Sequence, residues 1–175
     1  MKLSVHLVFW LYLLSGMQVG FASTFLCASD IALRGEVTVQ GFEGCTDITE
    51  FSETRYKDNQ TALPRAWRLG FPVTVSHPYW RSRMVEKARI DWLSVDHLKT
   101  VGNDSPRSFL RYRLLQVEIL AVSSIIDSSG IKERVDVSAR RVERMYRQIE
   151  QDQVGPWIIT CWDIQANEIN SGACP

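Results

Sequence analysis

SPRSFLRYRLLQVEILAVSSIIDSS, residues 105–129, is the most apolar stretch of the chain outside its N-terminus, and it decides the fold. No Gly or Pro follows Pro106 within it. Ser105 is a good N-cap, Pro106 suits the first helical position, and Gly130 follows a polar turn that stops a helix. At helical spacing the stretch has two apolar stripes, so we predict a central helix that is covered on two sides.

A strand is the alternative for the same residues. Between positions 115 and 121 apolar side chains, several of them β-branched, alternate with Gln116 and Glu118. The length of the stretch favours the helix, since strands commonly run to about 5–6 residues.

Two charges lie inside this apolar stretch. Arg111 and Glu118 are two helical turns apart, too far to pair along one helix. Because an unpaired buried charge is costly, each needs a partner from another element. We interpret them as buried charges in structural ion pairs, with a ligand site in the core as the alternative.

Residues 1–22 have the features of a signal peptide. Lys2 precedes the apolar run 7–14, and Gly20 and Ala22 supply the small residues before a cleavage site at Ser23. We therefore predict one exported globular domain over residues 23–175, secreted or periplasmic, with no membrane span once the signal is removed. An uncleaved N-terminal anchor is the alternative, because residues 3–22 are uncharged.

All four cysteines, Cys27, Cys45, Cys161 and Cys174, follow the signal segment. An even number in an exported chain predicts disulfides, and we favour the short-loop pairs Cys27–Cys45 and Cys161–Cys174 over pairs that join the two ends of the domain. No closely spaced cysteine pair favours a zinc site, so we predict no metal.

The rest of the chain predicts a small, mostly antiparallel sheet. Residues 30–39, 66–76 and 157–164 have strand character, and residues 43–63 resemble a long surface loop. Helical spacing over 78–93 and 138–151 predicts two further helices. We therefore predict a disulfide-stabilised α+β fold in which about three helices pack the sheet. The alternative is a partly open OB-like β-barrel with helices, in which residues 111–122 form a strand.

The chain contains 15 Arg and 5 Lys, and its formal net charge is zero. On the predicted helix 138–151, Arg140, Arg144 and Arg147 form a ridge, which is either an ordinary solvated face or a site for another protein with an acidic surface. Trp67 and Trp157 flank chain breakers and are predicted to be exposed partner-binding residues. Neutral charge and export disfavour nucleic acid as a partner.

The catalytic pattern is weak. His97 with Asp91 or Asp96 is the best pair of a base and an orienting carboxylate, and no motif for a nucleophile or a metalloprotease accompanies it. Nothing in the sequence calls for a cofactor.

Two short segments resemble netrin-like modules, which include the tissue inhibitors of metalloproteinases. They are CASDIALRGEV at 27–37, similar to the first-strand region of that family, and WIITCWDI at 157–164, similar to its late cysteine-bearing strand. The resemblance implies an OB-type barrel and an inhibitory role, although the small number of cysteines departs from that family.

Export, disulfides and uneven charge favour a non-enzymatic protein that binds another protein, as an accessory of an envelope assembly or a secretion apparatus. The alternatives are a small extracytoplasmic hydrolase and a secreted inhibitor or immunity-type protein.

Overall fold

The computed structural model describes residues 23–54, 65–100, 106–128, 130–150 and 153–175. The predicted signal peptide, residues 1–22, lies outside the described residues. Among the helices of the described part, none has the length and apolarity needed to cross a membrane.

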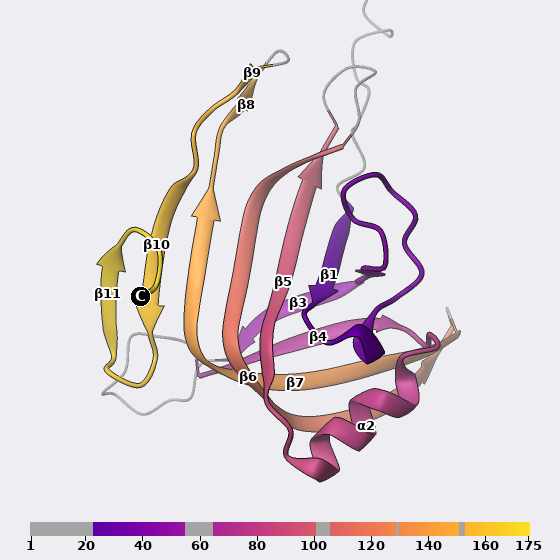
Figure 1. The fold of residues 1–175 in the computed structure, drawn as a ribbon. Helices are drawn as coiled ribbons and strands as arrows, with labels where there is room; N and C mark the ends of the chain where they lie inside the picture. The colour runs from indigo at the N-terminus through magenta and orange to yellow at the C-terminus, as the bar shows by residue number, and fades with distance from the viewer. Residues whose placement is uncertain (1–22, 55–64, 101–105, 129, 151–152) are drawn as a thin grey trace, which may run out of the picture.

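The chain folds into one large antiparallel sheet with one α-helix in the described residues (Figure 1). In the large sheet the strands are β1 (Thr24–Ala28), β2 (Thr46–Asp47), β3 (Glu50–Thr54), β4 (Ala66–Pro72), β5 (Ile90–Lys99), β6 (Arg107–Asp127), β7 (Gly130–Tyr146), β10 (Ile158–Asp163) and β11 (Glu168–Ser171). The helix α2 (His77–Glu86) and the short 3-10 helix η1 (Ile31–Leu33) accompany this sheet. A separate ribbon consists of β8 (Ile149–Glu150) and β9 (Gln153–Val154).

The long hairpin of β6 and β7 organises the sheet. Both strands bend from the upright part of the molecule into the lower part beside β4 and α2 (Figure 1). On its other side β7 pairs first with β4 and then with β10. On the other side of β6 lies β5, followed by β1 and β2.

The segment from β2 into β3 closes the sheet on itself. Its first residues pair with β1, and Ile48 N donates to Thr24 O at 2.9 Å. The next residue, Thr49, donates from its N to Gly70 O at 2.7 Å, and β3 then pairs with β4. The sheet therefore rolls around the main hydrophobic core, whose largest fully buried side chains include Trp67, Trp80 and Phe71, and a smaller cluster lies around Phe25 and Phe42.

The predicted central helix is wrong, because residues 107–127 form strand β6. The predicted helix 138–151 is also wrong, since most of it belongs to β7. In β7 the buried residues Val135, Val137 and Ala139 alternate with partly exposed ones, which is strand spacing. Cross-strand packing with β6 outweighs the local helix signals, and the α+β fold packed by about three helices is replaced by a mostly β fold.

Other elements match the sequence pattern in part. The predicted helix 78–93 is present only as α2, and its last residues belong to β5. Strands are present at Ala66–Pro72 and Ile158–Asp163, as the pattern indicated. The predicted strand 30–39 is wrong, because this segment contains η1 and an irregular loop.

A sharp bend crosses β6 and β7 at Gln116. The buried residues Leu114 and Val117 of β6 are three positions apart, as are their partners Val142 and Ala139 of β7. Two residues on one face of a regular strand are an even number of positions apart, so the strands reverse their facing here. Gln116 has a left-handed φ of 53°, which provides this reversal without a change of register.

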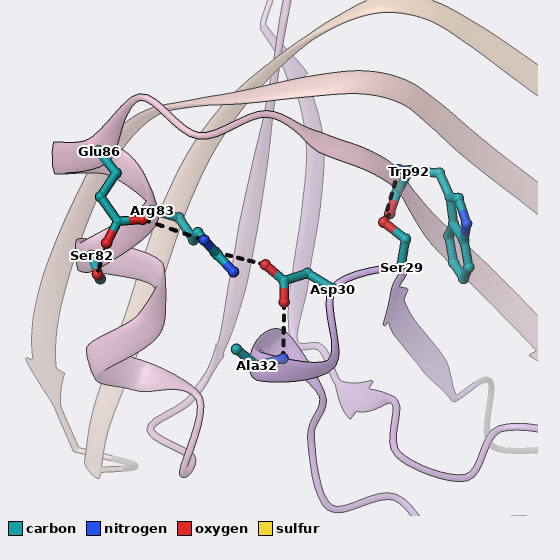
Figure 2. Close-up of polar contacts among 7 residues, drawn as sticks. All are labelled: Ser29, Asp30, Ala32, Ser82, Arg83, Glu86 and Trp92. Atoms are coloured by element: carbon teal, nitrogen blue, oxygen red, sulfur yellow. Dashed lines mark hydrogen bonds and ion pairs between the residues drawn. The ribbon is translucent and has the colours of Figure 1, made fainter.

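Helix α2 covers the lower opening of the rolled sheet. Its Trp80 is fully buried, with its ring centroid 5.6 Å from that of Phe71. Arg83 Nε of α2 donates to Asp30 Oδ2 at 2.7 Å, and Asp30 Oδ1 accepts from Ala32 N at 3.0 Å to cap η1 (Figure 2). The ion pair thus joins α2 to the segment after β1.

Candidate functional site

The face of β5, β6, β7 and β10 that turns away from the core carries an ordered set of polar side chains, and we call it the groove face. Strand register places its residues in rows across the sheet. One row consists of Cys27, Ser94, Arg113, Glu143 and Cys161. The next row consists of Phe25, Asp96, Arg111, Met145 and Ile159.

A disulfide stands at each end of the first row. Cys27 is bonded to Cys45, which holds the loop 34–45 against one side of the groove face. Cys161 is bonded to Cys174, which holds the C-terminal tail against the other side. Between these two walls lies an open groove of about 620 Å³. Both disulfides are those of the short-loop pairing preferred from the sequence.

The first charged group in the groove is built on Asp96, which is 1 % exposed. Arg111 Nε donates to its Oδ1 at 2.6 Å, and Ser94 Oγ donates to its Oδ2 at 2.7 Å. Arg111 thus has the partner from another element that the sequence indicated it needs, and its own side chain remains 35 % exposed toward the groove.

The second charged group is built on Glu143, which is also buried. Its Oε1 accepts from Cys174 N at 3.0 Å, so the disulfide-bonded tail contributes directly to the site. Its Oε2 lies 3.7 Å from Arg113 Nη1. The two carboxylates are therefore covered, while the two guanidinium groups are the parts that face solvent.

Tryptophan side chains flank these arginines. The Arg113 guanidinium carbon lies 5.7 Å from the ring centroid of Trp92. The main chain of Trp92 is hydrogen-bonded to the Ser29 hydroxyl, and its indole ring extends away from that contact (Figure 2). Trp157 receives two guanidinium groups, with Arg147 at 4.3 Å and Arg111 at 5.6 Å from its ring centroid. Cation–π contacts of this kind hold a guanidinium plane in a fixed orientation.

The arginine ridge predicted from the sequence is divided by the strand. Arg140 lies at the reversal of the strand, where its Nη1 donates to Gln116 Oε1 at 3.4 Å. Arg144 lies beyond the reversal, and its Nε donates to the Tyr112 hydroxyl at 3.3 Å. Arg147 lies on the groove face with Trp157. Arg144 and Arg147 are three positions apart, which places them on opposite faces of a strand.

Two further expectations are corrected. Trp67 is fully buried in the core, so it is not the exposed partner-binding residue that the sequence predicted. Glu118 is not buried: its side chain is 50 % exposed and pairs with Arg89 at 2.8 Å.

The structure does not bring the weak catalytic candidates together. Asp96 and His97 are neighbours on β5, so their side chains point to opposite faces. Asp96 is occupied by Arg111, and His97 Nδ1 lies 3.1 Å from Thr24 Oγ1. Asp91 is six residues away from His97 along the same strand, about 20 Å at strand rise. Burial lowers the pKa of His97.

Glu133 is a polar residue that the sequence reasoning missed. It is fully buried beneath α2, where its Oε1 lies 2.7 Å from His77 Nδ1. Burial raises the pKa of its carboxyl, against the influence of His77 and Arg81. Its position between Lys132 and Arg134 in a polar stretch of sequence carries no signal of burial. Within the described residues, no three His, Cys, Asp or Glu side chains cluster so as to hold a metal ion.

No protein-family profile matches the sequence, and no curated protein matches it in a sequence search. The fold nevertheless has solved counterparts, which are proteins of type VI secretion systems. Hcp1 from Salmonella typhimurium aligns with a TM-score of 0.69 and 17 % identity over 85 % of this chain and 99 % of its own. A structure described as a type six secretion system protein aligns with a TM-score of 0.72 and 15 % identity, also over 85 % of this chain and 99 % of its own.

A type VI secretion system effector from Yersinia pestis aligns with a TM-score of 0.64 and 13 % identity, over 81 % of this chain and 99 % of its own. At these identities the likeness establishes the fold. The rolled, mostly antiparallel sheet of the described residues, with its helix α2, has the fold of these Hcp proteins.

Proposed function

We propose that this protein is a non-enzymatic, exported component of a secretion apparatus of the type VI kind, and that it works by binding another protein. The observation that carries the proposal is the shared fold, which spans 99 % of Hcp1 and of the type six secretion system protein. Two of the matched proteins, the type six secretion system protein and the Yersinia pestis effector, belong to such systems, and a fold shared over a whole chain favours a related role.

The site chemistry supports binding over catalysis. Four charged side chains of the groove are held in pairs, Arg111 with Asp96 and Arg113 with Glu143. The histidine and aspartates considered for a hydrolase do not converge, so no specific observation favours that alternative. An open groove with half-exposed guanidinium groups and indole rings fits a protein surface.

Export is part of the proposal. Residues 1–22 act as the signal, residues 23–175 form the exported domain, and the disulfides form in an oxidising compartment outside the cytoplasm. The domain is then either periplasmic or released to the medium.

The test follows the untagged full chain with an antibody, because a C-terminal tag would disturb the tail beside Glu143. The host is a bacterium that carries a type VI secretion system, compared with the same host lacking that apparatus. We expect the chain in the periplasm of both hosts and in the medium of the first alone. A periplasmic marker enzyme controls for lysis.

Deletion of residues 1–22 is the companion experiment. We expect the truncated chain to stay in the cytoplasm with reduced cysteines. The chain is also cross-linked in the host that carries the apparatus. Two results together contradict the proposed function: equal amounts of the full chain in the medium of both hosts, and no cross-link between the chain and a protein of the apparatus.

A further inference from the structure

Arg147 differs from its neighbours on the groove face in its partners. Arg111 and Arg113 lie beside carboxylates, and Arg141 Nε donates to Asp163 Oδ2 at 3.2 Å. Arg147 Nε donates to the main-chain oxygen of Ser108 at 2.6 Å, and its guanidinium lies on Trp157. Across the described ranges no carboxylate pairs with Arg147, and its terminal nitrogens make no hydrogen bond.

The surroundings of Arg147 are positively charged and partly shielded from water. Burial lowers the pKa of Arg147, and so do the nearby Arg111 and Arg107, whereas Asp96 raises it. Asp96 is bonded to Arg111, so this one carboxylate stands against the three guanidinium groups of Arg107, Arg111 and Arg147. The Ser108 hydroxyl is buried and finds no hydrogen-bond partner among the described residues. An uncompensated, half-buried guanidinium is a strong attractor for an anion.

We propose that Arg147, fixed on Trp157, binds a carboxylate of an acidic segment in the partner protein. A planar guanidinium whose ring contact and Nε bond hold it in place presents its terminal nitrogens as a fork for a carboxylate. Arg111 both lines the groove and lies over Trp157, so the site continues into the groove. The segment that reaches Arg147 then runs past Arg111 toward Arg113.

This inference rests on the proposed function in one respect, namely that the partner is a protein. It adds the chemistry of the segment that binds and the residue that selects it. The excess positive charge around Arg147 commits this end of the groove to an acidic segment, and a small anion or a second copy of this chain are the other occupants that the test distinguishes.

The test measures binding of a fluorescein-labelled dodecapeptide of alternating Glu and Ser to the oxidised, signal-free protein by fluorescence anisotropy. A Gln and Ser dodecapeptide is the neutral control. We expect Arg147→Gln to weaken binding by about tenfold or more, because a bidentate charge-assisted contact is lost. Arg140→Gln, the same change at an arginine that does not line the groove, is expected to weaken it by about twofold or less.

Trp157→Phe supplies a second variant that keeps the packing. It should weaken acidic-peptide binding less than Arg147→Gln does and leave the thermal unfolding midpoint close to wild type. Equal losses in the Arg147 and Arg140 variants overturn the proposal, since they indicate unspecific attraction. Competition by inorganic phosphate at the same concentration as unlabelled peptide also overturns it, by assigning the site to small anions.

Self-association that Arg147→Gln abolishes, measured by sedimentation, overturns the proposal in favour of a second copy as occupant. The secretion assay is independent of the peptide measurement. If the peptide fails to bind while export still depends on the apparatus, the inference falls and the proposed function stands.

Discussion

Glu133 of β7 and His77 of α2 form a buried contact, with Oε1 and Nδ1 2.7 Å apart. The contact with His77 lowers the pKa of the Glu133 carboxyl, while burial, the larger effect, raises it. Glu133 faces Phe71 of β4 and Ser124 of β6 in register, with Arg81 of α2 as the other nearby charge. A carboxyl group thus lies under the helix that closes the sheet.

This contact makes stability depend on pH. The pKa of Glu133 is raised above its ordinary value of 4.5, so its contribution is fully present below that pH and is lost as the pH rises through the raised pKa. We expect Glu133→Gln to raise the free energy of unfolding at pH 8 and to change it little at pH 4. Urea unfolding across this range measures the difference, and a gain that is the same at both pH values rules out the mechanism.

The bend at Gln116 gives a second expectation. A non-glycine residue with left-handed φ costs roughly 1–2 kcal/mol, and a β-branched residue costs more. Gln116→Val should therefore lower the free energy of unfolding by about 1–2 kcal/mol. Gln116→Gly relieves the strain but raises the conformational entropy of the unfolded chain. Its free energy of unfolding should therefore stay within about 1 kcal/mol of the wild-type value. Both variants lose the contact with Arg140, and equal destabilisation by the two contradicts this explanation.

The tail disulfide is expected to stabilise the domain. Its cysteines are 13 positions apart, and a loop of that size corresponds to about 3 kcal/mol in the unfolded chain. The double change Cys161→Ser with Cys174→Ser should lower the free energy of unfolding by about that amount. With reductant present, the variant and the wild type should unfold at nearly the same denaturant concentration. A difference between their midpoints that remains under reducing conditions would show that the substitutions act through side-chain packing and not through the disulfide.

Asp30 combines a cap and an ion pair, which substitution can separate. Asp30→Ala removes both the hydrogen bond from Ala32 N and the ion pair with Arg83. Loss of the cap should lower the free energy of unfolding by about 1 kcal/mol. Asp30→Asn keeps an acceptor for the cap and should cost less, because the partly exposed ion pair contributes little. Hydrogen exchange of the amides of η1 should quicken in the alanine variant alone.

Several features were accessible from the sequence and others were not. Four cysteines allow three pairings, and the short-loop pairing that the sequence analysis favours is the one in the structure. Trp67 to Phe71 lies in a strand, as the pattern predicts. The helix at 105–129 was wrong because its length argued against a strand, and β6 is 21 residues long. That length is stable because β6 pairs with β7 over almost all of it, a long-range contact that no local pattern reports.

The groove was not predictable for a related reason. Arg111 was recognised as needing a partner, but only the register between β5 and β6 identifies that partner as Asp96. Helical spacing groups Arg147 with Arg140 and Arg144. On a strand, the three-residue spacing from Arg144 places Arg147 on the opposite face, where its guanidinium lies on Trp157. The residue types thus indicate that the arginines need partners, but only the pairing of the strands determines which residues those partners are.

The position of the two disulfides ties the groove to the place where the protein matures. Both walls are attached by bonds that form only under oxidising conditions, one at each end of the same row of side chains. If the domain is exported as proposed, a newly synthesised chain in the cytoplasm lacks these attachments, and the arginines of the groove are not yet held between the two walls. The groove would then be complete only after passage across the membrane.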